Sequence, residues 1–315
     1  MKQKKTLLFL ICSLAVLTAI AITEEAFREQ GKSQTLTEKK LFQVDFERVT
    51  HFSIDNNKQG PKISFQRVQD QWTITEPVET LADFKVVTAF LVNLQNYSYI
   101  KKFDSEGVQR SDYGLDPSGF TIVVNQTGDQ GKNHKLAFQV GDESPVGYGV
   151  YVTKDSDQHI YLGGKHLLLL VKKSLNEFRD KYFFRPNLQQ MQSVRISGGG
   201  KSVSWNDGEK SCQNESDCPA SVVSQFLSKL KSLRANRIAD LNDDFVNQEK
   251  FLYELKWNSE GENHYFGIWL NGGEVSGIYS PDLISVDLPF QVIEYFESVL
   301  VTSSASVSKL ADDHP

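Results

Sequence analysis

The second half of this 315-residue chain repeats a pattern found in the first half. Residues Val86–Leu94 read VVTAFLVNL and residues Val222–Leu230 read VVSQFLSKL, so five of the nine positions are identical. The shared residues recur at steps of three and four, which is the spacing of one face of an α-helix. A chain that uses the same amphipathic helix twice is constrained to build a similar core twice.

The order of elements around the two helices is also repeated. The strand KISF at 62–65 precedes the first helix, and SVSW at 202–205 precedes the second. Downstream, GVY at 149–151 returns as GIY at 277–279. Recurrence in the same order predicts a tandem duplication. Strands cluster before and after each helix without strict βαβ alternation, so we expect an α+β fold in which each copy is a mostly antiparallel sheet with packed helices.

Hydrophobic periodicity places the expected elements within each copy. In the first copy, strands are expected at Val49–Ile54, Ile63–Val68, Trp72–Ile74, Phe120–Val124, His134–Val140, Val150–Thr153 and His159–Leu162, and helices at Phe84–Asn96 and His166–Phe178. In the second copy, strands are expected at Met191–Ile196, at Ser202–Trp205 and between Leu252 and Val286, and helices at Pro219–Leu233 and Pro289–Leu300. The triplet Gly198-Gly199-Gly200 is expected to form a hairpin turn, because it lies between two strands and lacks the spacing of a phosphate-binding loop.

The N-terminus predicts a membrane anchor. Three lysines lie within residues 1–5, and residues 6–22 form an uncharged run of 17 residues, close to the lower limit for crossing a bilayer. Basic residues before the run and Glu24 and Glu25 after it orient the bulk of the protein outside the cytoplasm. The expected organisation is a cytoplasmic segment at 1–5, an anchor at 6–22, a polar stalk at 23–42, repeats at 43–182 and 183–300, and a disordered tail at 301–315. The alternative is a cleaved signal peptide ending at Ala19-Ile20-Ala21.

Two cysteines agree with an oxidising compartment. Cys212 and Cys218 enclose a short polar loop before the second helix, and the remaining cysteine, Cys12, lies in the apolar run. We expect a local disulfide between Cys212 and Cys218. The competing interpretation is a metal site, but a four-ligand zinc site needs two further donors and no histidine is near in sequence.

A set of residues in the first copy follows a recognisable family pattern. It comprises Trp72, Ile74, Pro77, Ala82-Asp83, Val87, Leu91, Leu94, the run Tyr113-Gly114-Leu115-Asp116-Pro117, Gly141, Tyr151, Ile160-Tyr161, Arg179-Asp180 and Phe183. Together these residues resemble the bacterial family catalogued as domain of unknown function 4340. The resemblance is good over Val44–Arg185 and loose in the second copy. It implies a membrane-tethered protein facing the periplasm, often encoded beside components of gliding-motility-type ABC transporters, and it brings no catalytic residue.

The remaining motifs favour structural roles over chemistry. The run at 240–244 begins like a calcium loop, but Phe245 and Phe251 occupy the positions of the required glycine and glutamate. The six histidines are scattered singly, and no Gly-x-Ser-x-Gly elbow supplies a nucleophile. Tyr148, Tyr151 and Tyr161 could line a ligand groove, although aromatic residues in strands more often serve packing. The pair Arg179-Asp180 is expected to be a structural junction that orients the second copy, and the alternative is an arginine that binds a ligand.

These features lead to an expected function. The net charge of −6 argues against nucleic-acid binding, which uses a basic stripe. We expect no catalytic, metal or cofactor site, and a single-pass protein of the inner membrane with its C-terminal bulk in the periplasm. Its partners would be the lipid bilayer and envelope or ABC-transporter proteins, for which it would be an accessory or binding module. A periplasmic glycan- or peptide-binding protein that uses the cleft between repeats is the alternative, and an envelope hydrolase is the third hypothesis.

Overall fold

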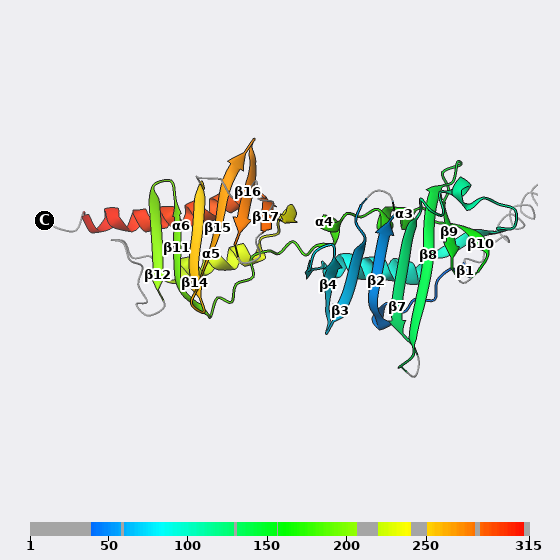
Figure 1. Cartoon of the computed structure of the whole chain (residues 1–315). Helices are drawn as coiled ribbons and strands as arrows, with labels where there is room; N and C mark the ends of the chain where they lie inside the picture. Colours follow the sequence, from blue (N-terminus) through cyan, green and yellow to red (C-terminus); the bar gives the residue numbers. More distant parts are fainter. Residues whose placement is uncertain are drawn as a thin grey trace, which may run out of the picture. The chain divides into compact units, whose positions relative to one another are not determined.

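The structure, a computed structural model, describes residues 39–57, 60–128, 131–155, 157–206, 220–240, 251–280 and 284–311. These residues form two antiparallel sheets accompanied by a few helices (Figure 1), which confirms the expected mostly antiparallel architecture. The expected anchor at 6–22 and the cysteines Cys212 and Cys218 lie outside the described residues. Among the helices in the described ranges, none combines the length and the apolar character that a membrane span requires.

In the described part of the chain, the first sheet has ten strands. They are β1 (Lys39–Lys40), β2 (Val49–Asn56), β3 (Ile63–Val68), β4 (Gln71–Glu76), β5 (Thr80–Leu81), β6 (Ser98–Asp104), β7 (Phe120–Thr127), β8 (Asn133–Glu143), β9 (Val150–Lys154) and β10 (His159–Gly163). Their order across the sheet is β1-β6-β10-β9-β8-β7-β2-β3-β4-β5. The chain also makes two short 3-10 turns, η1 (Phe46–Arg48) and η2 (Arg110–Tyr113).

The second sheet has seven strands within the described residues. They are β11 (Met191–Gly198), β12 (Lys201–Asn206), β13 (Arg237–Asp240), β14 (Tyr253–Ser259), β15 (Glu262–Asn271), β16 (Glu274–Tyr279) and β17 (Ile284–Leu288). Their order is β12-β11-β14-β15-β16-β17-β13. Gly199 and Gly200, both at positive φ (56° and 79°), connect β11 to β12, so the expected hairpin turn is confirmed. Glycine adopts this left-handed backbone without a steric penalty.

The two sheets share one strand order. Reading the second sheet from β13 to β12 gives the order β13-β17-β16-β15-β14-β11-β12. The strands that correspond to these in the first copy, by their order along the chain, are β6-β10-β9-β8-β7-β2-β3. These seven strands are neighbours in the same order in the first sheet. The first sheet adds β1 at one edge and β4 and β5 at the other. The sequence-related pairs, β3 with β12 and β9 with β16, occupy equivalent places.

Helix α2 (Phe84–Asn96) has the bounds that the sequence predicts. Its start is fixed by Asp83, whose carboxylate accepts hydrogen bonds from the backbone N–H groups of Lys85 at 3.0 Å and Val86 at 3.2 Å. The apolar positions of one face are buried. They are Val87, Phe90, Leu91 and Leu94. Phe90 stacks on Phe52 of β2, with ring centroids 5.3 Å apart.

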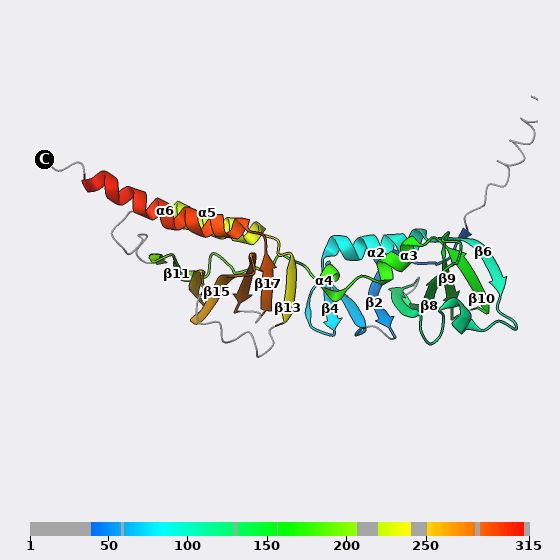
Figure 2. The same ribbon diagram turned by 90° about the horizontal axis from the view of Figure 1, so that it is seen from above.

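Helix α5 (Ala220–Ser232) buries the corresponding face. Its buried residues are Val223, Phe226, Leu227 and Leu230. Phe226 contacts Phe296 of α6 (Gln291–Ala311), with centroids 5.0 Å apart. In Figure 2, α5 and α6 run along one face of the second sheet, and α2 runs along one face of the first. Both copies therefore use the repeated helix in the same way.

Three sequence expectations differ from the structure. The helix expected at His166–Phe178 is interrupted, because it forms α3 (His166–Val171) and α4 (Leu175–Phe178). The interruption has a local cause: Ser174 and Glu177 form a capping box that starts a new helix. Strands β1, β5, β6 and β13 were not expected, because β1 and β5 have only two residues each and β6 and β13 show no clean apolar alternation. Helix α6 extends past Leu300, where the sequence pattern predicts an end.

By packing, the chain divides into two compact units. One contains the described residues of 1–62 and 90–172, and the other contains those of 63–89 and 173–315. Strands β6 to β10 belong to the first unit together with β2. Within it, Tyr97 donates a hydrogen bond to the carbonyl of Gly164 at 3.0 Å. A Cβ at Gly163 would lie 2.2 Å from the Tyr97 hydroxyl oxygen, so only glycine fits at the end of β10.

Candidate functional site

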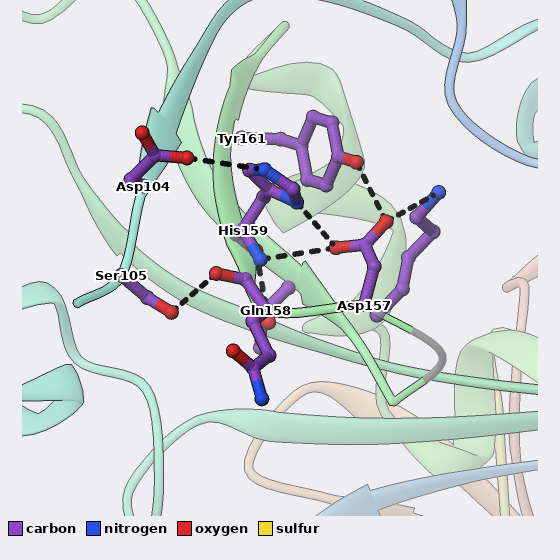
Figure 3. Close-up of polar contacts among 8 residues, drawn as sticks. Asp104, Ser105, Asp157, Gln158, His159 and Tyr161 are labelled. Atoms are coloured by element: carbon purple, nitrogen blue, oxygen red, sulfur yellow. Dashed lines mark hydrogen bonds and ion pairs between the residues drawn. The ribbon is translucent and has the colours of Figure 1, made fainter.

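A cluster of polar side chains gathers at the free end of the β9–β10 hairpin (Figure 3). His159 and Tyr161 are two residues apart on β10 and therefore point to the same face of the sheet. The strand register places Asp104 and Lys102 of β6 directly opposite them. Asp157 lies in the turn that precedes β10. The hairpin thus brings together residues from two strands and a turn.

Asp157 accepts three hydrogen bonds. The Tyr161 hydroxyl donates to Oδ2 at 2.7 Å, and the backbone N–H of His159 donates to Oδ1 at 3.1 Å. The ammonium group of Lys154, at the end of β9, lies 3.0 Å from Oδ2. The Nζ atom of Lys154 also lies 5.0 Å from the centroid of the Tyr161 ring, which is a distance typical of a cation–π contact. The carboxylate is therefore held on both oxygens.

His159 lies between two carboxylates (Figure 3). Its Nε2 is 3.1 Å from Oδ1 of Asp104, and its Nδ1 is 3.6 Å from Oδ1 of Asp157. Beside it, the backbone N–H of Ser105 donates to the carbonyl of Gln158 at 3.2 Å, and the Ser105 hydroxyl donates to the same carbonyl. These contacts attach the hairpin turn to the end of β6.

The contacts perturb the titration of two groups. Partial burial favours the neutral form of Asp157, but hydrogen bonds from Tyr161, Lys154 and the His159 N–H outweigh it, so the pKa of Asp157 is lowered. Burial raises the pKa of Tyr161, and its hydrogen bond to the Asp157 carboxylate raises that pKa further. Tyr161 therefore stays a neutral donor and Asp157 stays an anionic acceptor at neutral pH.

This arrangement can hold the strands together, and its described contacts do not assemble a nucleophile. The contacts that His159 makes through its ring nitrogens in the described residues are to carboxylates. A hydrolytic triad instead pairs histidine with a serine, cysteine or threonine side chain. Among the described residues, no group of histidine, cysteine, aspartate and glutamate side chains has the geometry of a metal site.

A cavity of about 990 Å³ adjoins the cluster at Lys154. Its lining comes from the segment before β2, from the β7–β8 hairpin and from the end of β9, all within the first unit. Gln126 fixes one wall: its side-chain amide donates to the carbonyl of Gln43 at 2.9 Å and accepts from the N–H of Asp45 at 2.9 Å. The cavity is thus bounded by segments that are held together by hydrogen bonds.

The residues that the sequence singled out lie elsewhere. Arg179 is 3% exposed and donates from Nη1 to the carbonyl of Ile238 at 3.1 Å, a contact inside the second unit. Asp180 accepts from the N–H of Tyr182 at 3.0 Å and pairs with Arg185 at 2.6 Å. The junction role of Arg179 and Asp180 stays a prediction. The calcium-like run continues into residues 241–250, outside the described residues.

Sequence reasoning missed the site itself. Of the tyrosines considered for a groove, Tyr161 belongs to the cluster, Tyr151 packs on Tyr113 with centroids 4.7 Å apart, and Tyr148 is 78% exposed. A local signal for the cluster exists, because Asp157, His159 and Tyr161 alternate along the chain. The contribution of Asp104 has no such signal, since it comes from a strand that the sequence pattern did not reveal.

Comparison with known proteins gives one match. Residues 72–251, more than half of the chain, match the family described as "Domain of unknown function (DUF4340)". No curated protein and no solved structure matches the chain. The matched segment contains the β9–β10 cluster, helices α2 and α5, and the pair Arg179-Asp180. The chain therefore belongs to the family of domain of unknown function 4340.

Proposed function

We propose that this protein is a membrane-anchored accessory module of an envelope complex that acts by binding rather than by catalysis. Residues 6–22 would hold it in the inner membrane, and the two sheets would lie in the periplasm. The partner would be a membrane-embedded exporter of the ABC type. The family resemblance in the sequence motivates this choice of partner.

The main support is the repeated architecture. Seven strands have the same order in both sheets, and the repeated helix buries equivalent residues in each. We infer that the two copies arose by duplication. A duplication gives a protein a second copy of its fold and of its surface. A catalytic centre instead needs one specific arrangement of chemical groups. A duplicated scaffold suits a protein that presents surfaces to partners.

The polar cluster gives secondary support. The contacts of Asp157 stay within the hairpin, and His159 connects the hairpin to Asp104 of the neighbouring strand, which is the pattern of a structural clamp. Perturbed titration alone does not indicate catalysis, because structural networks of ion pairs also shift pKa values.

The test is co-purification of the full chain from detergent-solubilised membranes through a C-terminal tag. We expect exporter permease and ATPase components to be recovered in fixed stoichiometry and to remain bound on size-exclusion chromatography. The matched control carries a cleavable leader in place of residues 1–22, which should lose the partner if the anchor is required for assembly. A monomeric chain that carries a bound sugar or peptide and no exporter component would overturn the proposal.

The anchor is tested separately. The full-length protein should stay in the membrane pellet after carbonate washing. A mature N-terminus at Ile22 in the soluble periplasmic fraction would instead show that the segment is a signal peptide.

A further inference from the structure

The cavity beside the polar cluster is positively charged although the chain is acidic. Four cationic side chains line it, namely Lys40, Arg48, Lys135 and Lys154, and so does His134. Among the described residues, two carboxylates share the lining, those of Asp45 and Asp155. The formal excess of positive charge contrasts with the net charge of −6 of the whole chain. Focused positive charge in a concave surface attracts anions.

Two of the four cations have no carboxylate partner among the described contacts. Arg48 pairs with Asp45 at 3.3 Å, and Lys154 pairs with Asp157 at 3.0 Å. Lys40 instead donates to the neutral side-chain amide of Asn96 at 3.3 Å, and Lys135 is exposed at the start of β8. Lys40 and Lys135 are therefore available to an anion without first breaking an ion pair.

The paired cations are held in place, which favours a defined site over a diffuse charged surface. Lys154 is only 20% exposed and is positioned by Asp157 and by the Tyr161 ring. The segment that carries Arg48 is attached to β7 through Gln126, and the Asp45 side chain caps the turn by accepting from the N–H of Glu47 at 3.2 Å. Groups held before binding lose less entropy when a ligand arrives.

We propose that this cavity binds an anionic ligand that carries phosphate or carboxylate groups. The inference rests on the proposed binding role and adds the chemical class of the ligand. Lys40 and Lys135 supply charge without a carboxylate partner among the described contacts, and Lys154 supplies a cation held in place by Asp157. A volume of about 990 Å³ admits a ligand larger than a single phosphate.

The same chemistry occurs in two sources, an anionic lipid headgroup and a soluble anionic metabolite. Calorimetric titration of the full chain in non-ionic detergent with glycerol 1-phosphate, citrate or inorganic phosphate, at constant ionic strength, measures the soluble source. Binding to the full chain in nanodiscs of phosphatidylcholine, with and without phosphatidylglycerol, measures whether the lipid occupies the cavity and competes with the soluble anion. Saturable binding in one arm identifies the source, and either arm supports the proposal.

The decisive variant is Lys135→Glu, and the matched control is Lys132→Glu. Lys132 lies on the same hairpin and is also exposed, but it is not among the residues that line the cavity. We expect Lys135→Glu to weaken anion binding about tenfold or more, because a charge-assisted contact is replaced by repulsion. Lys132→Glu should change the affinity by less than about twofold, because exposed charges outside the site are screened. Lys40→Gln should weaken binding while it preserves the fold, as measured by circular dichroism.

Two results would overturn the inference. One is the absence of saturable binding in both arms, and the other is an equal loss of affinity in Lys135→Glu and Lys132→Glu, which would show unspecific surface attraction. Failure of the proposed function is distinguishable, because exporter co-purification is measured on the unmodified chain without added anion. The absence of a partner there leaves the calorimetric result unaffected.

Discussion

The β9–β10 hairpin of the first sheet and the β16–β17 hairpin of the second occupy the same place in the repeated strand order. The tyrosine of the GVY motif pairs with Leu162, and the tyrosine of the GIY motif pairs with Ile284. In the second hairpin that pair is the last one within the described residues, which leave out 281–283. In the first hairpin the register continues for two more pairs, up to Thr153 and Ile160. The polar cluster of Asp157, His159 and Tyr161 lies on this extension.

This difference separates two kinds of sequence constraint. Apolar residues of the common scaffold recur in both copies, because both sheets need the same helix-covered face. The polar residues of the cluster lie at the free end of the β9–β10 hairpin, in the first copy. The cationic cavity also adjoins this hairpin, because Lys154 at the end of β9 lines it. We therefore associate features found in one copy with function. We associate features common to both copies with the stability of the fold.

The largest expected effect tests whether the scaffolds are equivalent. Substituting Phe90 or Phe226 by Ala should each lower the free energy of unfolding by about 3–4 kcal/mol, because each leaves a cavity among fully packed rings. Urea unfolding of the full chain in detergent measures the loss. The controls are the exposed residues Phe84 and Phe290, whose replacement by Ala should cost less than about 1 kcal/mol. A loss of stability in only one of the two variants, Phe90→Ala or Phe226→Ala, would show that the two helices do not have equivalent roles in their cores.

The next effect concerns Arg179, which follows the last helix of the first copy. Arg179→Leu should destabilise the protein by about 2 kcal/mol, because the carbonyl of Ile238 loses a charged donor in a buried setting. Arg185→Leu is the matched control. Arg185 is 40% exposed, so the loss of its ion pair with Asp180 should cost less than about 1 kcal/mol. Equal effects of the two variants would argue against a structural role specific to Arg179.

The pair Cys212 and Cys218 belongs to the second copy and has no counterpart in the sequence of the first copy. If Cys212 and Cys218 form a disulfide, the double substitution by Ser should lower stability by about 2 kcal/mol, the entropy of closing a short loop. Mass spectrometry of unreduced, alkylated protein taken from the envelope should show the two residues linked. Recovery of both as free alkylated thiols would contradict the bond and the assignment to an oxidising compartment.

The smallest expected effect is that of Tyr161→Phe, which removes one hydrogen bond from the extension. Its cost at neutral pH should be about 1 kcal/mol, because Asp157 is partly exposed. The pKa of Asp157 is lowered in the folded state, so the stabilisation it provides is present above the ordinary carboxyl pKa of about 4 and is lost as pH falls through the lower folded value. The difference between the variant and the unmodified protein should therefore shrink below about pH 4. A difference that is constant from pH 3 to pH 7 would exclude this account.

Much of the fold could be predicted from the sequence, and the reason is periodicity. Helix α2 and strand β3 have the bounds that their apolar spacing indicates, and the recurrence of VVxxFLxxL located the equivalent faces of α2 and α5. Strands β6 and β13 were not predicted from the sequence, and the reason is the same for both. Both follow the repeated helix and lie near a sheet edge, where solvent covers more of the strand and charged residues replace the apolar alternation.

The candidate site was less predictable because its groups are joined by pairing register rather than by proximity in sequence. Asp104 and His159 are 55 positions apart and meet only because β6 pairs with β10. The cavity depends in addition on Gln126, which attaches the segment before β2 to β7. The contact of Asp104 with His159 cannot be deduced without knowing that β6 exists, and the contacts of Gln126 cannot be deduced without knowing how the segment before β2 lies against β7.

Strand β6 has a further consequence for the solution behaviour of the protein. Strand β1 covers β6 only at Ser98 and Tyr99, so in the described part of the chain the outer edge from Ile100 to Asp104 has no neighbouring strand. An uncovered edge is a template on which another molecule can continue the sheet. Lys101 and Lys102 lie on this edge and are exposed, and an incoming identical strand would bring the same charges against them. Like-charge repulsion thus hinders growth of the ten-stranded sheet from one molecule to the next and opposes aggregation at high protein concentration.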